Sequence, residues 1–209
     1  MRTRPALAIA LAASVVLGGA VASAAPKVKP VCNLLVDAKD DAKGFLVTEP
    51  GPVPVSDPNL DILSADLATD AKKITAVIRL AAMDATDPMS PGGHAFYLNF
   101  SVNGVPFYLN ADNDATLGRS FSVGGFDAEG FRASFGEASG VFDVMKKEIR
   151  ITAPLSALTG AGKVKPGATI DGIEALAQRL AVVLTPSADD AVASATYKAQ
   201  APSCVAVGK

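Results

Sequence analysis

The sequence predicts an all-β fold: a single-domain, antiparallel β-sandwich of jelly-roll-like form with about ten strands. The first observation behind this prediction is the strict alternation of apolar and polar side chains on both sides of Asn103-Gly104, which gives a strand one buried and one exposed face. The second is the regular spacing of other short apolar runs between turns rich in Gly, Pro, Asn and Asp, which is typical of sandwiches and barrels.

The N-terminus has the three parts of a secretory signal peptide. Arg2 and Arg4 form a charged region, residues 6–21 are apolar and uncharged, and Ala22-Ser23-Ala24 supplies a cleavage site of small residues. The alternative is an uncleaved membrane anchor, but the apolar run is short for a membrane span. We therefore expect cleavage after Ala24 and a secreted, extracellular protein.

Cleavage there leaves 209 − 24 = 185 residues, which we interpret as a short tether over 25–30 and one β-sandwich domain over 31–209. Two of the 19 basic residues are lost with residues 1–24, so the mature charge balance is 17 − 21 = −4. A mildly acidic chain without a basic block argues against nucleic acid and against anionic membrane surfaces as partners. No later apolar run is long enough to cross a bilayer, so the mature form is expected to have no membrane span.

The first part of the domain is predicted to form strands that are interrupted by one loop. Residues 31–36 read as a strand, and residues 45–58 read as a loop, because their four prolines lack the N–H that a ladder needs. Residues 60–67 and 73–80 are the next two strands. In the second of these, Ile74, Ala76, Ile78 and Leu80 share the inner face, and Arg79 faces out.

The central feature is a β-hairpin around Asn103-Gly104, because both positions of the favoured two-residue turn need a positive φ. This turn sets Phe100 opposite Phe107 on the core side. It sets Asn99 opposite Tyr108 and Tyr97 opposite Asn110 on the outer side. Rings that cover sugar faces and amides that bind hydroxyls suit a glycan, so we expect these four side chains, with Arg79 nearby, to be an exposed ligand-binding patch. The alternative is a set of ordinary cross-strand pairs.

The second half of the chain continues the pattern of short strands. Strands are predicted at 119–123, 131–135, 141–144, 148–153 and 197–205, with at most one helical turn at 154–158. Residues 169–184 are ambiguous, because Ile170, Ile173, Leu176 and Leu180 also fit a helical stripe. We favour strand, since all the neighbouring elements are strands.

The two cysteines, Cys32 and Cys204, lie near the two ends of the mature chain. An exported chain meets an oxidising compartment, so a disulfide between them is the simplest prediction, and two free thiols are the alternative. The bridge would close a loop of 204 − 32 = 172 residues.

Four short motifs occur in an order that resembles the family 9 carbohydrate-binding modules and the wider DOMON-like group of secreted β-sandwiches. The motifs are Asp37-x-x-x-Asp41, then Leu60-Asp61-Ile62 with Ala65-Asp66, then residues 147–154 with Leu158, and Gly167-Ala168-Thr169-Ile170-Asp171-Gly172-Ile173. The resemblance covers about 31–204. It extends to exported bacterial proteins with a cysteine at each end.

The resemblance implies carbohydrate binding and structural calcium, with Asp37, Asp41 and Asp61 as the matching metal positions. Calcium prefers oxygen ligands from loop aspartates and carbonyls, and the alternative is that these carboxylates are solvated turn residues. The modules of this family stack sugars between tryptophans. The present chain has no tryptophan, so stacking would have to rest on tyrosine.

The sequence gives little support for catalysis, and we assign no catalytic residue. It has no G-x-S-x-G motif, and its single histidine, His94, is expected at the surface. A glycosidase needs only two carboxylates at the right separation, so it is retained as a third reading. The leading hypothesis is a secreted, non-catalytic protein that binds an extracellular carbohydrate or cell-envelope polymer. The alternative is an exported, envelope-associated interaction protein without a small-molecule ligand.

Overall fold

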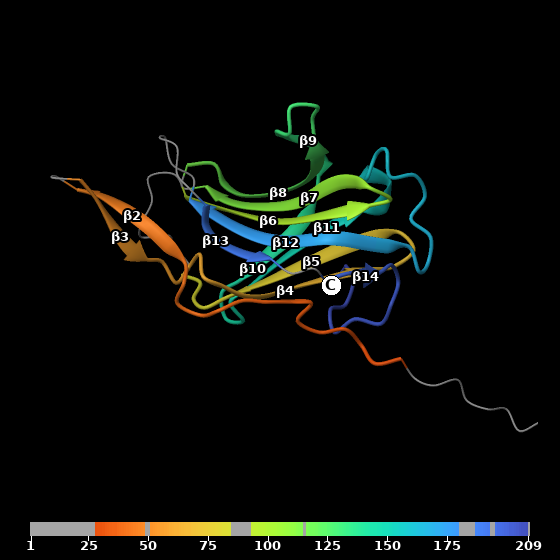
Figure 1. Cartoon of the computed structure of the whole chain (residues 1–209), viewed down its shortest axis with the longest axis horizontal. Coiled ribbons are helices and arrows are strands. Elements are labelled where there is room, and N and C mark those ends of the chain that lie inside the picture. The colour runs from red at the N-terminus through yellow and green to blue at the C-terminus, as the bar shows by residue number, and fades with distance from the viewer. Residues whose placement is uncertain are drawn as a thin grey trace, which may run out of the picture.

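A computed structural model describes residues 28–48, 51–84, 93–114, 116–179, 187–192 and 195–208. The predicted signal peptide, residues 1–24, lies outside the described residues. The fold is the predicted all-β sandwich: two antiparallel sheets pack face to face, with a separate hairpin at one end (Figure 1). No helix in the described residues is long and apolar enough to cross a membrane.

The first sheet has five strands in the order β1-β4-β5-β11-β10. Its strands are β1 (Leu35–Val36), β4 (Ile62–Thr69), β5 (Lys73–Leu80), β10 (Ser139–Asp143) and β11 (Glu148–Pro154). The second sheet has the order β13-β12-β6-β7-β8-β9, and β14 also pairs with β12. Its strands are β6 (Gly93–Val102), β7 (Val105–Asp114), β8 (Gly118–Phe126), β9 (Arg132–Glu137), β12 (Thr169–Arg179), β13 (Ser187–Val192) and β14 (Tyr197–Lys198).

The central hairpin has the predicted register. β6 and β7 pair Val102 with Val105 and Phe100 with Phe107, across a turn in which Asn103 has φ 53° and Gly104 has φ 77°. Phe100 and Phe107 are 1% and 0% exposed, and their ring centroids are 6.0 Å apart. Both therefore lie in the apolar core between the two sheets, as the alternation predicts.

The two edges of the sandwich are closed differently. At one edge the chain itself crosses from the second sheet to the first, because Ala138 alone separates β9 from β10. At the other edge β1 of the first sheet lies near β13 of the second. No continuous chain joins these two strands, so side chains must hold this edge together.

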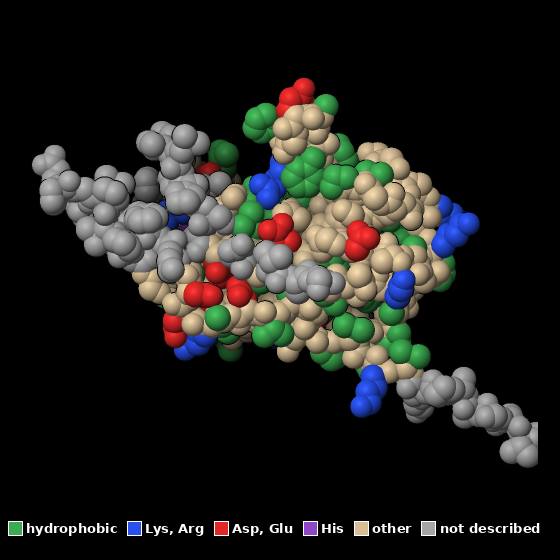
Figure 2. Space-filling model, viewed as in Figure 1, with side chains coloured by type: hydrophobic (Ala, Val, Ile, Leu, Met, Phe, Trp, Pro, Cys, Tyr) green, Lys and Arg blue, Asp and Glu red, His purple; other side chains and the backbone are tan. Residues whose placement is uncertain are grey.

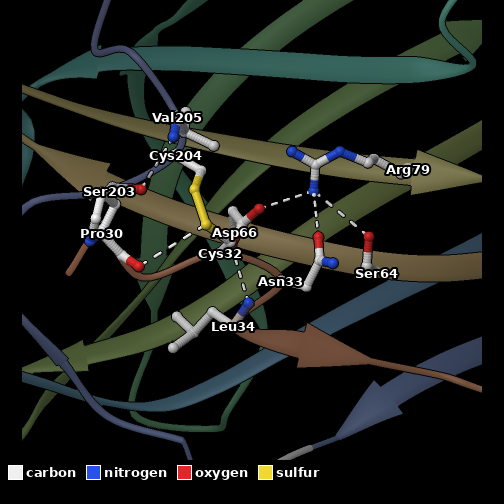
Figure 3. Close-up of a disulfide and its surroundings, with 10 residues drawn as sticks. All are labelled: Pro30, Cys32, Asn33, Leu34, Ser64, Asp66, Arg79, Ser203, Cys204 and Val205. Atoms are coloured by element: carbon white, nitrogen blue, oxygen red, sulfur yellow. Dashed lines mark hydrogen bonds and ion pairs between the residues drawn. A yellow bond between two sulfur atoms is a disulfide. The ribbon is translucent and has the colours of Figure 1, made fainter.

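The first and last segments of the described chain meet on the outside of the first sheet. The predicted Cys32–Cys204 disulfide is confirmed, with the two Cα atoms 5.1 Å apart, and Cys204 N–H donates to the Val31 carbonyl at 2.9 Å. Figure 3 shows the bridge beside Asp66, which accepts a hydrogen bond from Leu34 N–H. The C-terminal segment covers part of this outer face, so the outward-facing Val77 is fully buried.

The structure corrects two sequence predictions about secondary structure and settles a third. Residues 43–56 contain an antiparallel hairpin, β2 (Lys43–Thr48) with β3 (Gly51–Ser56), where we predicted a loop. The prolines are tolerated because β3 pairs with β2 alone, so its other edge needs no donors. Residues 169–179 are a strand, as favoured. The terminal strands are shorter than predicted, since only Leu35–Val36 and Tyr197–Lys198 form ladders.

Candidate functional site

Three aspartates from distant parts of the chain converge at the edge between β1 and β13. One carboxylate oxygen from each of Asp37, Asp41 and Asp189 lies within 4.8 Å of the others. Asp37 follows β1, Asp41 lies in the loop before β2, and Asp189 lies in β13. Figure 2 shows acidic side chains gathered near the base of the β2–β3 hairpin, which residues 37–42 precede. The structure thus brings together two of the three predicted metal positions.

Asp61, the third predicted position, lies behind this group. Its Oδ2 accepts a hydrogen bond from Asp40 N–H at 2.8 Å, which turns the carboxylate toward the loop that carries Asp37 and Asp41. The residue is 0% exposed, and its Oδ1 has no hydrogen-bond partner in the described part of the chain. A buried carboxylate oxygen without a partner is costly, so this oxygen points to a bound group that would satisfy it.

The pKa values of the site residues show an excess of negative charge. Burial, together with the charges of Asp37, Asp41 and Asp61, raises the pKa of Asp189 to about 7, against the lowering effect of a hydrogen bond from Ile62 N–H. Burial and the charges of Asp41 and Asp40 likewise raise the pKa of Asp61. Three of the main influences on the pKa of Asp189 are negative charges, so a cation would relieve the repulsion directly.

The donor set fits a hard divalent cation, and calcium in particular. Two oxygens bound to one calcium at about 2.4 Å can be at most about 4.8 Å apart, and the three closest carboxylates meet that limit. Oxygen ligands without thiolate or imidazole do not suit zinc. Magnesium is usually held by one or two carboxylates and several waters, so a site with three or four aspartates favours calcium.

Asp189 is the functional residue that sequence reasoning missed. It follows Ser187 and Ala188 and precedes Asp190, in a segment without a recognisable ligand motif. Its carboxylate reaches the site because β13 pairs with β12, with Asp189 opposite Ala177, and it then accepts a hydrogen bond from Ile62 N–H in the other sheet. Only this long-range strand pairing assigns it to the site, and local sequence carries no signal of the pairing.

The predicted ligand patch on the outer face of the second sheet has the expected register but not the expected exposure. Tyr97 pairs with Asn110 and Asn99 with Tyr108, yet Tyr108 and Asn110 are each only 4% exposed. The two tyrosine rings meet edge-on at 74°, with centroids 5.9 Å apart. The expectation of a flat, coplanar, exposed platform was therefore wrong.

The cause is the β8–β9 hairpin, which rises from the sheet (top of Figure 1) and covers part of this face. Arg132 of β9 places its guanidinium 4.0 Å from the centre of the Tyr97 ring. Gly124 allows the Tyr108 ring to lie directly on β8, because a Cβ there would overlap the Tyr108 phenol group and the Ala133 carbonyl.

Beside Arg132 the outer face keeps an open polar region. Tyr97, Asn99 and Glu174 are half-buried, and Asn99 Nδ2 donates to Glu174 Oε2 at 3.1 Å. Asn99 Oδ1 is buried and accepts no hydrogen bond from any described residue. The region therefore holds an acceptor that a ligand hydroxyl or a water molecule would satisfy.

Arg79 does not belong to this face. It lies on the outside of the first sheet, where its Nη1 forms an ion pair with Asp66 Oδ2 at 2.7 Å (Figure 3). It also contacts Glu148. The prediction that Arg79 supplements the tyrosine patch was wrong, because β5 and β6 belong to different sheets.

His94 is buried, at 3% exposure, where we expected a surface residue. Its Nε2 lies 3.6 Å from Asp57 Oδ2, and the same carboxylate pairs with Arg179. His94 also lines a cavity of about 20 Å³ with Asn113, Arg119 and Phe142. That volume holds about one water molecule, so we assign this group a structural role.

Comparison of the chain with protein-family models, with curated proteins and with solved structures finds no match. The site must therefore be interpreted from its own geometry.

Proposed function

We propose that the chain is an exported, non-catalytic binding protein whose best-supported ligand is one calcium ion, held by Asp37, Asp41 and Asp189 with the buried carboxylate of Asp61 behind them. The buried, unpartnered Oδ1 of Asp61 beside the three-carboxylate group carries the proposal. The Cys32–Cys204 disulfide supports export, because such bridges persist in oxidising compartments.

Isothermal titration calorimetry of the mature chain with calcium tests this proposal. We expect one calcium per chain, with a dissociation constant of about 10⁻⁴ to 10⁻³ M, the range of extracellular calcium modules. Asp61→Asn keeps an acceptor for Asp40 N–H but removes the charge, and should weaken calcium binding about tenfold or more.

Asp171→Asn is the matched control, because Asp171 is exposed on β12 and belongs to the other end of that strand. This variant should bind calcium like the unmodified chain. An absence of calcium heat in the unmodified chain at millimolar concentrations would overturn the proposal.

A second candidate ligand is an extracellular carbohydrate at the outer face of the second sheet. The supporting observation is the unpartnered Asn99 Oδ1 next to Glu174 and the half-buried Tyr97. A sugar hydroxyl could donate to Asn99, while Arg132 and Glu174 would bind further hydroxyls. Since Arg132 already stacks on Tyr97, the aromatic contact would be small, and we expect affinities of about 10⁻⁵ to 10⁻³ M, or about −4 to −7 kcal/mol.

Glycan-array binding tests the second candidate. Asn99→Ala and Tyr97→Ala should abolish any glycan signal, whereas Arg79→Ala, on the other sheet, should leave it unchanged. If the chain binds calcium but no glycan, the result would favour the alternative, an exported interaction protein without a carbohydrate ligand.

A further inference from the structure

The four aspartates of the candidate calcium site come from both sheets of the sandwich. Asp37 directly follows β1, and Asp61 directly precedes β4, so both belong to the first sheet. Asp189 lies in β13, the terminal strand of the second sheet. The site therefore spans the edge that no continuous chain closes.

β13 contacts the first sheet through the buried Ala191 in the common core and through one direct hydrogen bond at the edge. Within the described residues, one hydrogen bond runs from the first sheet to β13: Ile62 N–H donates to Asp189 Oδ2 at 2.5 Å. The acceptor of that bond is also the carboxylate that faces Asp37 and Asp41. This hydrogen bond across the edge thus lies where like charges oppose one another.

A divalent cation would reverse the sign of the interaction at this edge. Without it, ionised carboxylates on the two sheets repel one another, and the burial of Asp189 strengthens that repulsion because the local dielectric is lower than in water. With it, the same carboxylates share one positive centre and attract one another through it. We propose that the cation is a clamp that closes the β1–β13 edge, so that β13 is held to the first sheet when the site is loaded and separates from it when the site is empty. This inference rests on the proposed calcium function.

The clamp has a consequence for the neighbouring strand. β13 pairs with β12 through Ala175, Leu176 and Ala177, among others. When β13 separates, this stretch of β12 becomes the edge of the second sheet. β12 also carries Glu174, the partner of Asn99 on the outer face, so loading the clamp should stiffen the strand that borders that polar region.

Hydrogen–deuterium exchange of the mature chain, in millimolar calcium and in chelator, tests the clamp. Exchange times should be short compared with global unfolding, so that local opening is measured. We expect the amides of Ser187–Val192 and of Ile62 to exchange about tenfold or more slowly in calcium. The amides of β10, at the edge closed by the chain, should exchange equally in both solutions.

The Asp189→Asn variant distinguishes bridging by the cation from repulsion between the carboxylates. The asparagine oxygen can still accept the hydrogen bond from Ile62 N–H, but the charge on β13 is removed. In chelator, β13 should then exchange at least as slowly as in the unmodified chain, and calcium should no longer slow it. Asp171→Asn, an exposed carboxylate on the adjacent strand, should retain the full calcium response.

The outcomes distinguish the clamp from the site on which it rests. If calorimetry shows no calcium binding, the proposed function fails, and the clamp fails with it. If calcium binds but β13 exchange does not change, or all strands slow equally, the site stands and the clamp is overturned. The comparison of the unmodified chain in calcium and in chelator decides this without any variant.

Discussion

Four carboxylates in the described residues are almost fully buried near or between the sheets, and they differ in which groups offset their charge. Asp66 pairs with Arg79 and accepts from Leu34 N–H, and Asp57 pairs with Arg179 and His94. Asp61 and Asp189 accept only backbone N–H groups among the described residues. Because buried charges in proteins are paired or bind metals, this difference identifies the candidate site.

Asp57 should make the protein sensitive to acid. Burial raises its pKa, but the hydrogen bond and charge of His94 and the charge of Arg179 outweigh burial, so the net pKa is lowered. The stabilisation is therefore present above pH ~4 and is lost as the pH falls through the lowered pKa. Asp57→Asn should cost about 3–5 kcal/mol at neutral pH and should flatten the acid limb of a stability–pH curve measured by urea unfolding. A curve that keeps its steep acid limb would contradict this assignment.

Phe100 tests the packing of the core at a single position. The side chain is 1% exposed and faces Phe107, so Phe100→Ala should lower the free energy of unfolding by about 3–5 kcal/mol. Phe131 is 70% exposed, and Phe131→Ala should change the free energy of unfolding by less than about 1 kcal/mol. Urea unfolding measures both variants, and equal losses would refute the difference in burial.

At the scale of elements, the features that the sequence predicted are those with local causes. The Asn103-Gly104 turn fixes the β6–β7 register, so the pairing of all ten residues of each strand follows from two turn residues and alternation. Alternation also placed Tyr108 and Asn110 correctly on the outer face. It could not reveal their burial, because the covering β8–β9 hairpin turns up from the sheet, and that path depends on long-range packing.

The terminal segments are held by a disulfide and by hydrogen bonds. The Cys32–Cys204 bridge closes 172 residues, and Asp66 anchors the backbone of Leu34 close by (Figure 3). Replacing both cysteines with serine should cost about 2–5 kcal/mol. Thermal unfolding of the oxidised chain and of the double variant measures this loss. An unchanged melting temperature would mean that Asp66 and the packed tail suffice without the bridge.

At the scale of the whole molecule, the two edges of the sandwich make it asymmetric. The β9–β10 edge is closed by the backbone, whereas four aspartates lie at the β1–β13 edge, which no backbone connection closes. The family resemblance suggested three of these residues, Asp37, Asp41 and Asp61. It did not suggest Asp189, because β13 and β4 belong to different sheets, and Ile62 and Asp189 are 127 residues apart in the chain.

The melting temperature of the mature chain in chelator and in millimolar calcium tests the central claim most directly. A ligand that binds only the native state at ten times its dissociation constant stabilises it by about 1.4 kcal/mol, or about 3–6 °C for a chain of this length. We expect this rise for the unmodified chain and for Asp171→Asn, and we expect it to be lost in Asp61→Asn. Identical melting curves for the unmodified chain in calcium and in chelator would rule out the calcium site.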